Sequence, residues 1–249
     1  MKLLYYLAAI GPHHYDKKIE IFFKNIEHIF HEMSDEISSI DVMINMYEDN
    51  QSFIDSLHSF ERIDKIYIHK KKGVLAELWK TNPHHNVVEN YDMVFFILDD
   101  IEVEDLHMKS MLEIKEKHKL DIISPRVRKA THRWLMDSFQ KDEYLLLVNM
   151  VEIYMMLITP DVFYRFMEVH DVENKWIWGV DMLLGHFGFQ CGIYKDACVL
   201  HYFPNRGNNR EAYNGMMLYI KKHGYDNTKH IIQKYPRIKS RLKLDKIIL

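Results

Sequence analysis

The sequence has little cysteine and no apolar run long enough to cross a membrane. Only Cys191 and Cys198 are cysteines among its 249 residues, and no CxxC pair occurs, which excludes a disulfide framework and indicates a reducing compartment. The apolar stretch at residues 2–10 is far shorter than the roughly 20 residues that span a bilayer, and it lacks the basic region and the cleavage site of a secretion signal. We therefore expect a cytoplasmic protein, either free or peripheral to a membrane.

Several common site motifs are also missing. The chain has no GxGxxG and no Walker lysine pattern, which argues against a dinucleotide site and against a P-loop site. It has 16 histidines but no HExxH and no cysteine-rich set, so we interpret the histidine pairs at 13–14 and 84–85 as surface residues. A net charge of −3 and a pI near 6.6 argue against a general nucleic-acid binder.

Charge is spread unevenly along the chain. Residues 89–121 hold ten acids against four lysines, and residues 206–249 hold eleven lysines or arginines against three acids. The first balance fits an acidic site for a cation, and the second fits a tail that meets an anion or a membrane surface. A solvated basic helix explains the tail equally well.

Apolar patterns of strand and helix period alternate in the first half of the chain. They predict strands at 2–10, 41–47, 65–69 and 92–98 and helices at 16–33, 51–60, 73–81 and 104–118. Such alternation indicates a parallel sheet with right-handed crossovers. With 47% hydrophobic residues the chain can bury a full core. We expect one α/β domain, Rossmann-like, with a mainly parallel central sheet flanked by helices.

The second half is less regular. Its patterns predict strands at 121–124 and 152–159, two short strands on either side of residues 195–197, a helix at 160–168, a turn and short helix at 176–188, and final helices near 208–223 and 227–234. The stretch 126–145 gives no assignment. We expect this half to be smaller and irregular and to end in a basic helical tail over 206–249.

Two adjacent acids, Asp99 and Asp100, end the apolar run of residues 94–98. Ligands of open α/β sheets bind beyond the carboxyl ends of the strands, where this pair would lie. Neighbouring carboxylates repel each other unless donors or a cation neutralise them, and Mg²⁺ or Mn²⁺ does so with one or two carboxylates and substrate phosphates. Ordinary turn or helix-cap chemistry is the alternative.

Three segments together resemble the GT-A-fold glycosyltransferases, which use nucleotide sugars. The stretch "VFFILDDIEV" (94–103) looks like their strand with a D-x-D-type motif, "WIWGVDMLLG" (176–185) is similar to their W-G-x-D turn, and "KDACVLHYFP" (195–204) resembles their late strand ending in His. One departure is that Leu98 stands where the first acid of the motif is expected. The resemblance therefore implies Asp100 as metal ligand and Asp99 as a helper to ribose or to a metal-bound water.

The same resemblance implies roles for further residues. His201 would complete a Mn²⁺ or Mg²⁺ site, although a structural histidine is the alternative, and Asp181 would be the catalytic base, although a helix cap explains it too. Trp176 and Trp178 could stack on a sugar, but we expect a core position for them. The nucleotide-binding half would be 1–100 and the metal and acceptor half 101–205. Small Ala8 and Ala9 at the end of the first strand would admit the base of the nucleotide. Lys72 and Arg206 would meet its phosphates, with an ordinary basic turn and an ordinary loop arginine as the alternatives.

The function implied is a metal-dependent, inverting glycosyltransferase. It would move a sugar from a UDP- or GDP-linked donor to a hydroxyl of a glycan or lipid-linked acceptor, without a nucleic-acid partner. Two alternatives stay open. A sugar nucleotidyltransferase would use a similar sheet and metal but needs a Gly-rich basic first loop, which "AAIGPHHYDKK" (8–18) supplies poorly. A non-catalytic nucleotide- or glycan-binding protein would explain Leu98 in the motif.

Overall fold

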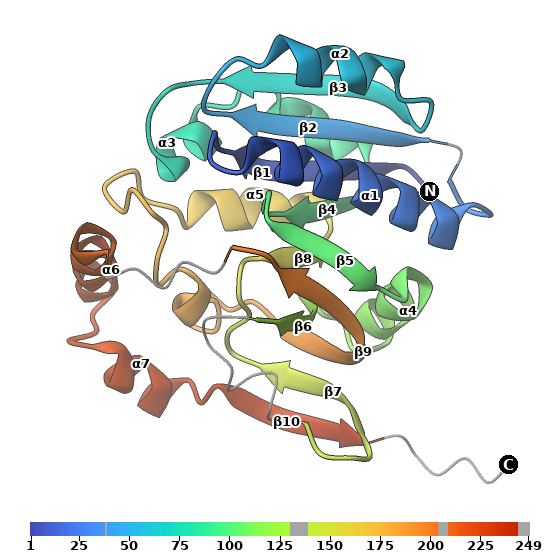
Figure 1. The fold of residues 1–249 in the computed structure, drawn as a ribbon. Coiled ribbons are helices and arrows are strands. Elements are labelled where there is room, and N and C mark those ends of the chain that lie inside the picture. The colour runs from blue at the N-terminus through green and yellow to red at the C-terminus, as the bar shows by residue number, and fades with distance from the viewer. Residues whose placement is uncertain (38, 130–138, 204–208, 244–249) are drawn as a thin grey trace, which may run out of the picture.

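The computed structural model describes residues 1–37, 39–129, 139–203 and 209–243, and its centre is a ten-stranded sheet (Figure 1). Along the main path the strands follow the order β10-β7-β9-β6-β8-β4-β1-β2-β3, and β5 pairs with β9 off this path. The strands are β1 (Leu3–Ile10), β2 (Ile40–Met46), β3 (Ile63–Lys70), β4 (Met93–Ile97), β5 (Ile101–Asp105), β6 (Ile122–Arg128), β7 (Glu143–Val148), β8 (Met155–Ile158), β9 (Cys191–His201) and β10 (Ile238–Lys243).

Helices cover both faces of the sheet. They are α1 (Tyr15–Met33), α2 (Gln51–Ser59), α3 (Leu75–Lys80), α4 (Met108–Lys117), α5 (Pro160–Glu168), α6 (Arg210–Lys222) and α7 (Thr228–Lys234), with short 3₁₀ helices at His85–Asn90 and Asp181–Leu183. Every residue of β1 is buried because helices cover it on both sides, and such a strand reads as an unbroken apolar run.

Successive side chains of β1 enter two separate cores. Leu3, Tyr5 and Leu7 join the core under α1, α2 and α4, whereas Leu4, Tyr6 and Ala8 join the core under α3 and α5. This follows from the period of two along a strand, which sends neighbouring side chains to opposite faces. The amphipathic helices predicted between the first four strands are therefore needed on both faces, and the structure has them there.

The strand directions match a mainly parallel sheet. β1 is parallel to β2 and β4, β2 is parallel to β3, and β6 is parallel to β9. The pairs β4–β8, β6–β8, β7–β9, β5–β9 and β10–β7 are antiparallel. Seven of the ten described strands therefore point one way and β5, β7 and β8 the other, so the predicted α/β fold class is confirmed.

The structure differs from the sequence prediction in three places. Residues 101–105, partly assigned to a helix at 104–118, form β5, and the helix starts only at Met108. The two predicted strands around residues 195–197 are one strand, β9, whose register against β6 shifts at those residues. The tail predicted as helical contains α6 and α7 but also β10, which pairs with the equally unpredicted β7.

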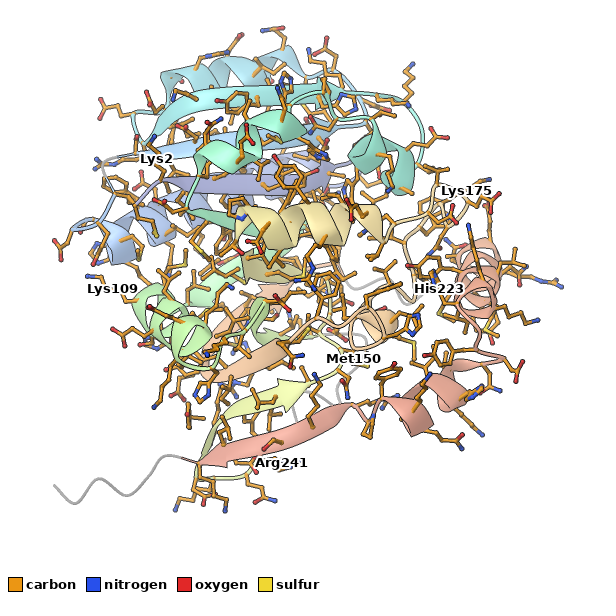
Figure 2. All side chains as sticks on the ribbon, turned by 180° about the vertical axis from the view of Figure 1, so that it is seen from behind. Lys2, Lys109, Met150, Lys175, His223 and Arg241 are labelled. Carbon is orange, nitrogen blue, oxygen red and sulfur yellow. The ribbon has the colours of Figure 1, made fainter. Side chains whose placement is uncertain are left out.

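Figures 1 and 2 show on which side of the sheet the carboxyl ends of the parallel strands lie. The arrows of β2 and β3 point to the left in Figure 1, so the carboxyl ends of the parallel strands lie on that side. In Figure 2, which is turned by 180°, Lys175 and His223 lie on the corresponding right-hand side, opposite Lys2 at the start of β1. None of the helices described is long and apolar enough to cross a membrane.

Candidate active site

The two acids lie in the turn between β4 and β5, at the carboxyl edge of the sheet. The side chain of Asp99 is 16% exposed and that of Asp100 is 14% exposed. Two partly buried carboxylates at adjacent positions need compensation from donors or cations. The structure compensates each of them separately, from different parts of the chain.

Asp99 is held by the segment that follows β1. Its Oδ2 atom accepts a hydrogen bond from the backbone N–H of Gly11 at 2.9 Å and lies 2.7 Å from the Lys18 ammonium of α1. Burial raises the pKa of Asp99, the Lys18 charge opposes this rise, and the neighbouring Asp100 carboxylate adds to it. Both contacts use Oδ2, so Oδ1 has no hydrogen-bond partner among the described residues and can accept from a ligand.

Asp100 is held instead by the end of β9. Its Oδ2 lies 3.0 Å from Nε2 of His201, and its backbone carbonyl accepts from the N–H of Tyr202 at 2.9 Å. The cause is the antiparallel pairing of β5 with β9, in which Ile101 lies opposite His201. The unpredicted strand β5 is therefore what brings the carboxylate and the imidazole together across 101 positions of the sequence.

The Asp100–His201 pair is compatible with a divalent ion. Neighbouring ligands of an octahedral ion at about 2.1 Å lie about 3 Å apart, which matches the separation of Oδ2 and Nε2. Carboxylate with imidazole suits Mn²⁺, and a site of one or two protein ligands leaves positions for water and phosphate oxygens. The described residues contain no group of three or more His, Cys, Asp or Glu placed to hold a metal. A metal here would therefore need ligand oxygens from elsewhere.

Aromatic side chains join the start of α1 to the end of β9. The His14 ring stacks on Phe203, with centroids 4.2 Å apart and planes at 9°, and the Lys17 ammonium lies 4.8 Å from the ring centroid of Tyr202. Burial first, and then the charge of Asp99, raise the pKa of Tyr15 to about 12. Sequence reasoning missed these residues, although the position of 11–18 after the first strand places them at the ligand-binding edge.

Asp181 is the first residue of the 3₁₀ helix Asp181–Leu183. Val180 occupies the N-cap position of that helix, so Asp181 is not its N-cap residue. Figure 2 places Lys175, six residues earlier in the chain, on the carboxyl side of the sheet. Trp176 and Trp178 are 37% and 38% exposed, and the expected core position for this pair is therefore wrong. The role of Asp181 as a base stays a prediction.

The residues predicted to bind the nucleotide lie in different surroundings. Ala8 is fully buried and its carbonyl accepts from the Trp79 indole at 2.6 Å, whereas Ala9 is 8% exposed at the strand end. Lys72 is exposed after β3 at the same edge. Arg206 lies outside the described residues. Their binding roles stay predictions.

Solved structures with a similar fold exist despite low sequence identity. GalNAc-T7, solved with UDP, GalNAc and Mn²⁺, matches 92% of this chain at TM-score 0.61 and 7% identity, and TarS of S. aureus matches 94% at TM-score 0.53 and 10% identity. Both are GT-A glycosyltransferases. The chain has the GT-A fold.

The likeness concerns the GT-A fold itself. The match covers 49% of the GalNAc-T7 chain and 42% of the TarS chain, so this chain spans about half the length of these proteins or less. A shorter form of TarS, residues 1–349, is covered to 69% at TM-score 0.52 and 10% identity. No protein-family model matches the sequence, and no curated protein matches it either.

Proposed function

We propose that this chain is a metal-dependent glycosyltransferase that uses a nucleotide-diphosphate sugar. The observation that carries the proposal is the contact between Asp100 and His201 at the carboxyl edge of a GT-A fold. GT-A enzymes are the structures that the fold resembles, and one of them was solved with UDP and Mn²⁺. The donor is a UDP- or GDP-linked sugar, and the acceptor is a hydroxyl of a glycan or of a lipid-linked glycan.

The acid pair would divide the binding of the donor between two carboxylates. Asp100 and His201 would hold Mn²⁺ or Mg²⁺, which when bound would supply positive charge to balance the diphosphate. Asp99 uses its open Oδ1 to accept a hydrogen bond from a ribose hydroxyl or a metal-bound water. Its other oxygen is fixed by Gly11 and Lys18, which keeps the open oxygen in one orientation.

Asp181 is the base in this proposal. Its carboxylate takes the proton of the acceptor hydroxyl while the acceptor oxygen forms a bond to the anomeric carbon. The bond from that carbon to the diphosphate oxygen breaks at the same time, and the diphosphate leaves with the electron pair. Attack from the face opposite the leaving group inverts the configuration. A carboxylate used in this way forms no covalent bond to the sugar.

Melting temperatures with a panel of nucleotides test the proposal. UDP or GDP with Mn²⁺ at about 100 times Kd should raise the melting temperature by roughly 5–10 °C, and Asp100→Ala should abolish this metal-linked shift. Asp35→Ala is the matched control, because Asp35 is an exposed acid at the far end of α1 that pairs with Lys109. Absence of any metal-linked shift in the native protein would reject the metal-dependent mechanism.

Turnover separates the remaining alternatives once a nucleotide has been found. Release of UDP or GDP from the matching sugar nucleotide, with transfer to a glycan acceptor, supports the transferase. Formation of a sugar nucleotide from a sugar phosphate and a nucleoside triphosphate would instead establish a nucleotidyltransferase. Nucleotide binding without either reaction would favour a binding protein, which the departure at Leu98 also favours. A cytoplasmic location and membrane contact through the basic tail stay predictions.

A further inference from the structure

A lysine lies inside the proposed donor site, beside one acid only. The Lys18 side chain is 11% exposed, and its Nζ lies 2.7 Å from Oδ2 of Asp99 and 3.4 Å from the carbonyl oxygen of Gly11. Burying an ammonium is costly unless a carboxylate pairs with it. The neighbouring Lys17 is different, because it pairs with Glu20 on the helix surface. Lys18 is therefore held against Asp99, beyond the carboxyl ends of the neighbouring strands β1 and β4.

The charges of the four central side chains can be added. Asp99 and Asp100 contribute two negative charges, Lys18 contributes one positive charge, and a His201 that binds a metal is neutral. The sum is one negative charge. A divalent ion turns this into one positive charge, which favours an anionic diphosphate. Without Lys18 the same site would start from two negative charges and reach only neutrality with the ion.

We propose that Lys18 sets the balance between the affinity of this site for the metal ion and its affinity for the nucleoside diphosphate. The ammonium repels the ion and so weakens its binding, and it attracts the diphosphate and so strengthens its binding. This inference rests on the proposed function for the identity of the ligands, and it assigns this balance to a residue outside the acid motif.

Mn²⁺ binding without nucleotide tests the inference directly, by the spin-resonance signal of the free ion. Lys18→Met should tighten binding of Mn²⁺ alone on the order of tenfold, because a nearby repelling charge is gone. With saturating Mn²⁺, the same variant should bind UDP or GDP on the order of tenfold more weakly. Lys18→Arg keeps the charge and should restore both values toward those of the native protein.

The matched control is Lys65→Met. Lys65 also lies beside a largely buried acid, Asp41, at 3.8 Å, but at the amino ends of β2 and β3. It should change neither affinity. If Lys18 only supported the local structure, Lys18→Met would weaken both ligands, and that result would overturn the inference. An unchanged Mn²⁺ affinity in Lys18→Met would overturn it as well.

A double variant keeps the test decisive if Lys18→Met does not fold. Lys18→Met with Asp99→Asn removes the buried unpaired charge and returns the sum to one negative charge. Its affinity for Mn²⁺ alone should lie near the native value, and a tenfold difference would contradict the charge argument. A native protein that binds neither Mn²⁺ nor a nucleoside diphosphate would overturn the proposed function itself, whereas native binding with unchanged affinities in Lys18→Met overturns only the role of Lys18.

Discussion

Asp99 and Asp100 are neighbours in the sequence, but they belong to two differently built halves of the molecule. Asp99 is fixed by Gly11 and Lys18, which follow the first strand of the parallel half. Asp100 is fixed by His201, at the end of a strand from the half with mixed directions. The parallel half supplies the N–H donor and the ammonium for Asp99, whereas the second half supplies the imidazole for Asp100. The candidate site therefore exists only where the two halves meet.

This comparison shows how the fold can hold two like charges side by side. Each acid has its own partner, so neither depends on a metal for its compensation in the structure. The partners differ in kind, because Lys18 carries a permanent charge whereas His201 can be neutral and bind a metal. Asp99 is thus neutralised by a protein cation, whereas Asp100 and its imidazole partner are available to bind an ion. Four predictions test this division, from the largest expected effect to the smallest.

The largest effect should come from the second half, at Asp181. Asp181→Asn should lower kcat on the order of 100-fold or more, because the amide cannot take the acceptor proton. Nucleotide binding with Mn²⁺ should be unchanged, as measured by calorimetry. Asp196→Asn is the control, since Asp196 is exposed on β9. Full turnover in Asp181→Asn would remove this residue from the mechanism.

The next effect concerns the helix that joins the halves. Asn25 of α1 completes the free edge of β5, because its side chain donates to the carbonyl of Ile101 at 2.8 Å and accepts from the N–H of Val103 at 2.8 Å. Asn25→Ala leaves these two buried groups without partners and should cost about 2–4 kcal/mol in unfolding free energy, measured by urea denaturation.

Asn25→Ala should also weaken Mn²⁺ binding, because the pairing of β5 with β9 places Asp100, just before β5, against His201. Asn45→Ala provides the comparison within the parallel half. Asn45 is buried and bonds to Tyr6 and Asn82, so its loss should destabilise the fold and leave Mn²⁺ affinity unaffected. Equal effects of the two variants on Mn²⁺ affinity would show that the halves do not differ in the way described.

The two halves also differ in how far their sequence predicts them. Of the first four strands, β1, β2 and β4 are largely apolar and buried throughout, whereas β3 mixes apolar and polar residues and has none fully buried. Amphipathic helices separate them, and periodicity locates all four. In β5 the residues Ile101, Glu102, Val103 and Glu104 alternate between apolar and acidic, which is the period of a strand, and this short signal beside the acid pair was missed. Glu102 is buried and pairs with Lys24 of α1. This partner from a distant segment could not be predicted from the strand alone.

The residues of the candidate site also differ in how far the sequence predicts their positions. The position of Asp100 and His201 at strand ends made their proximity predictable once the sheet was assumed. Lys18 was not predictable, since nothing in "DKKIE" (16–20) distinguishes the lysine that pairs with Asp99 from Lys17, which pairs with Glu20 on the surface. The rotation of α1 against the sheet makes that choice, and it depends on the whole apolar face of the helix.

A third prediction concerns pH and the contact between α1 and α4. Although burial alone would raise the pKa of Glu32, its hydrogen bond with His28 and the backbone N–H groups of Met108 and His107 lower it to about 2. A carboxylate with a lowered pKa stabilises the fold above its ordinary pKa of 4.5, and this contribution is lost as the pH falls through about 2.

Glu32→Gln should therefore lower the unfolding free energy by about 2–3 kcal/mol at pH 7 and flatten its dependence on pH between 4.5 and 2. Denaturant melts across this range measure both effects. The control is Glu27→Gln, an exposed residue of the same helix, which should keep the native pH dependence. A Glu32→Gln profile parallel to the native one would mean that this contact between the halves does not depend on charge.

The smallest effect is expected at Lys72, at the outer edge of the parallel half. Because Lys72 is exposed, Lys72→Ala should leave the melting temperature unchanged. If the residue meets the donor phosphates, affinity for UDP or GDP with Mn²⁺ should fall about threefold at low salt, and the difference should shrink as added salt screens the charge. Titrations at two ionic strengths measure this. An unchanged affinity at low salt would exclude Lys72 from the donor site and leave Lys18 as the cation that the parallel half contributes there.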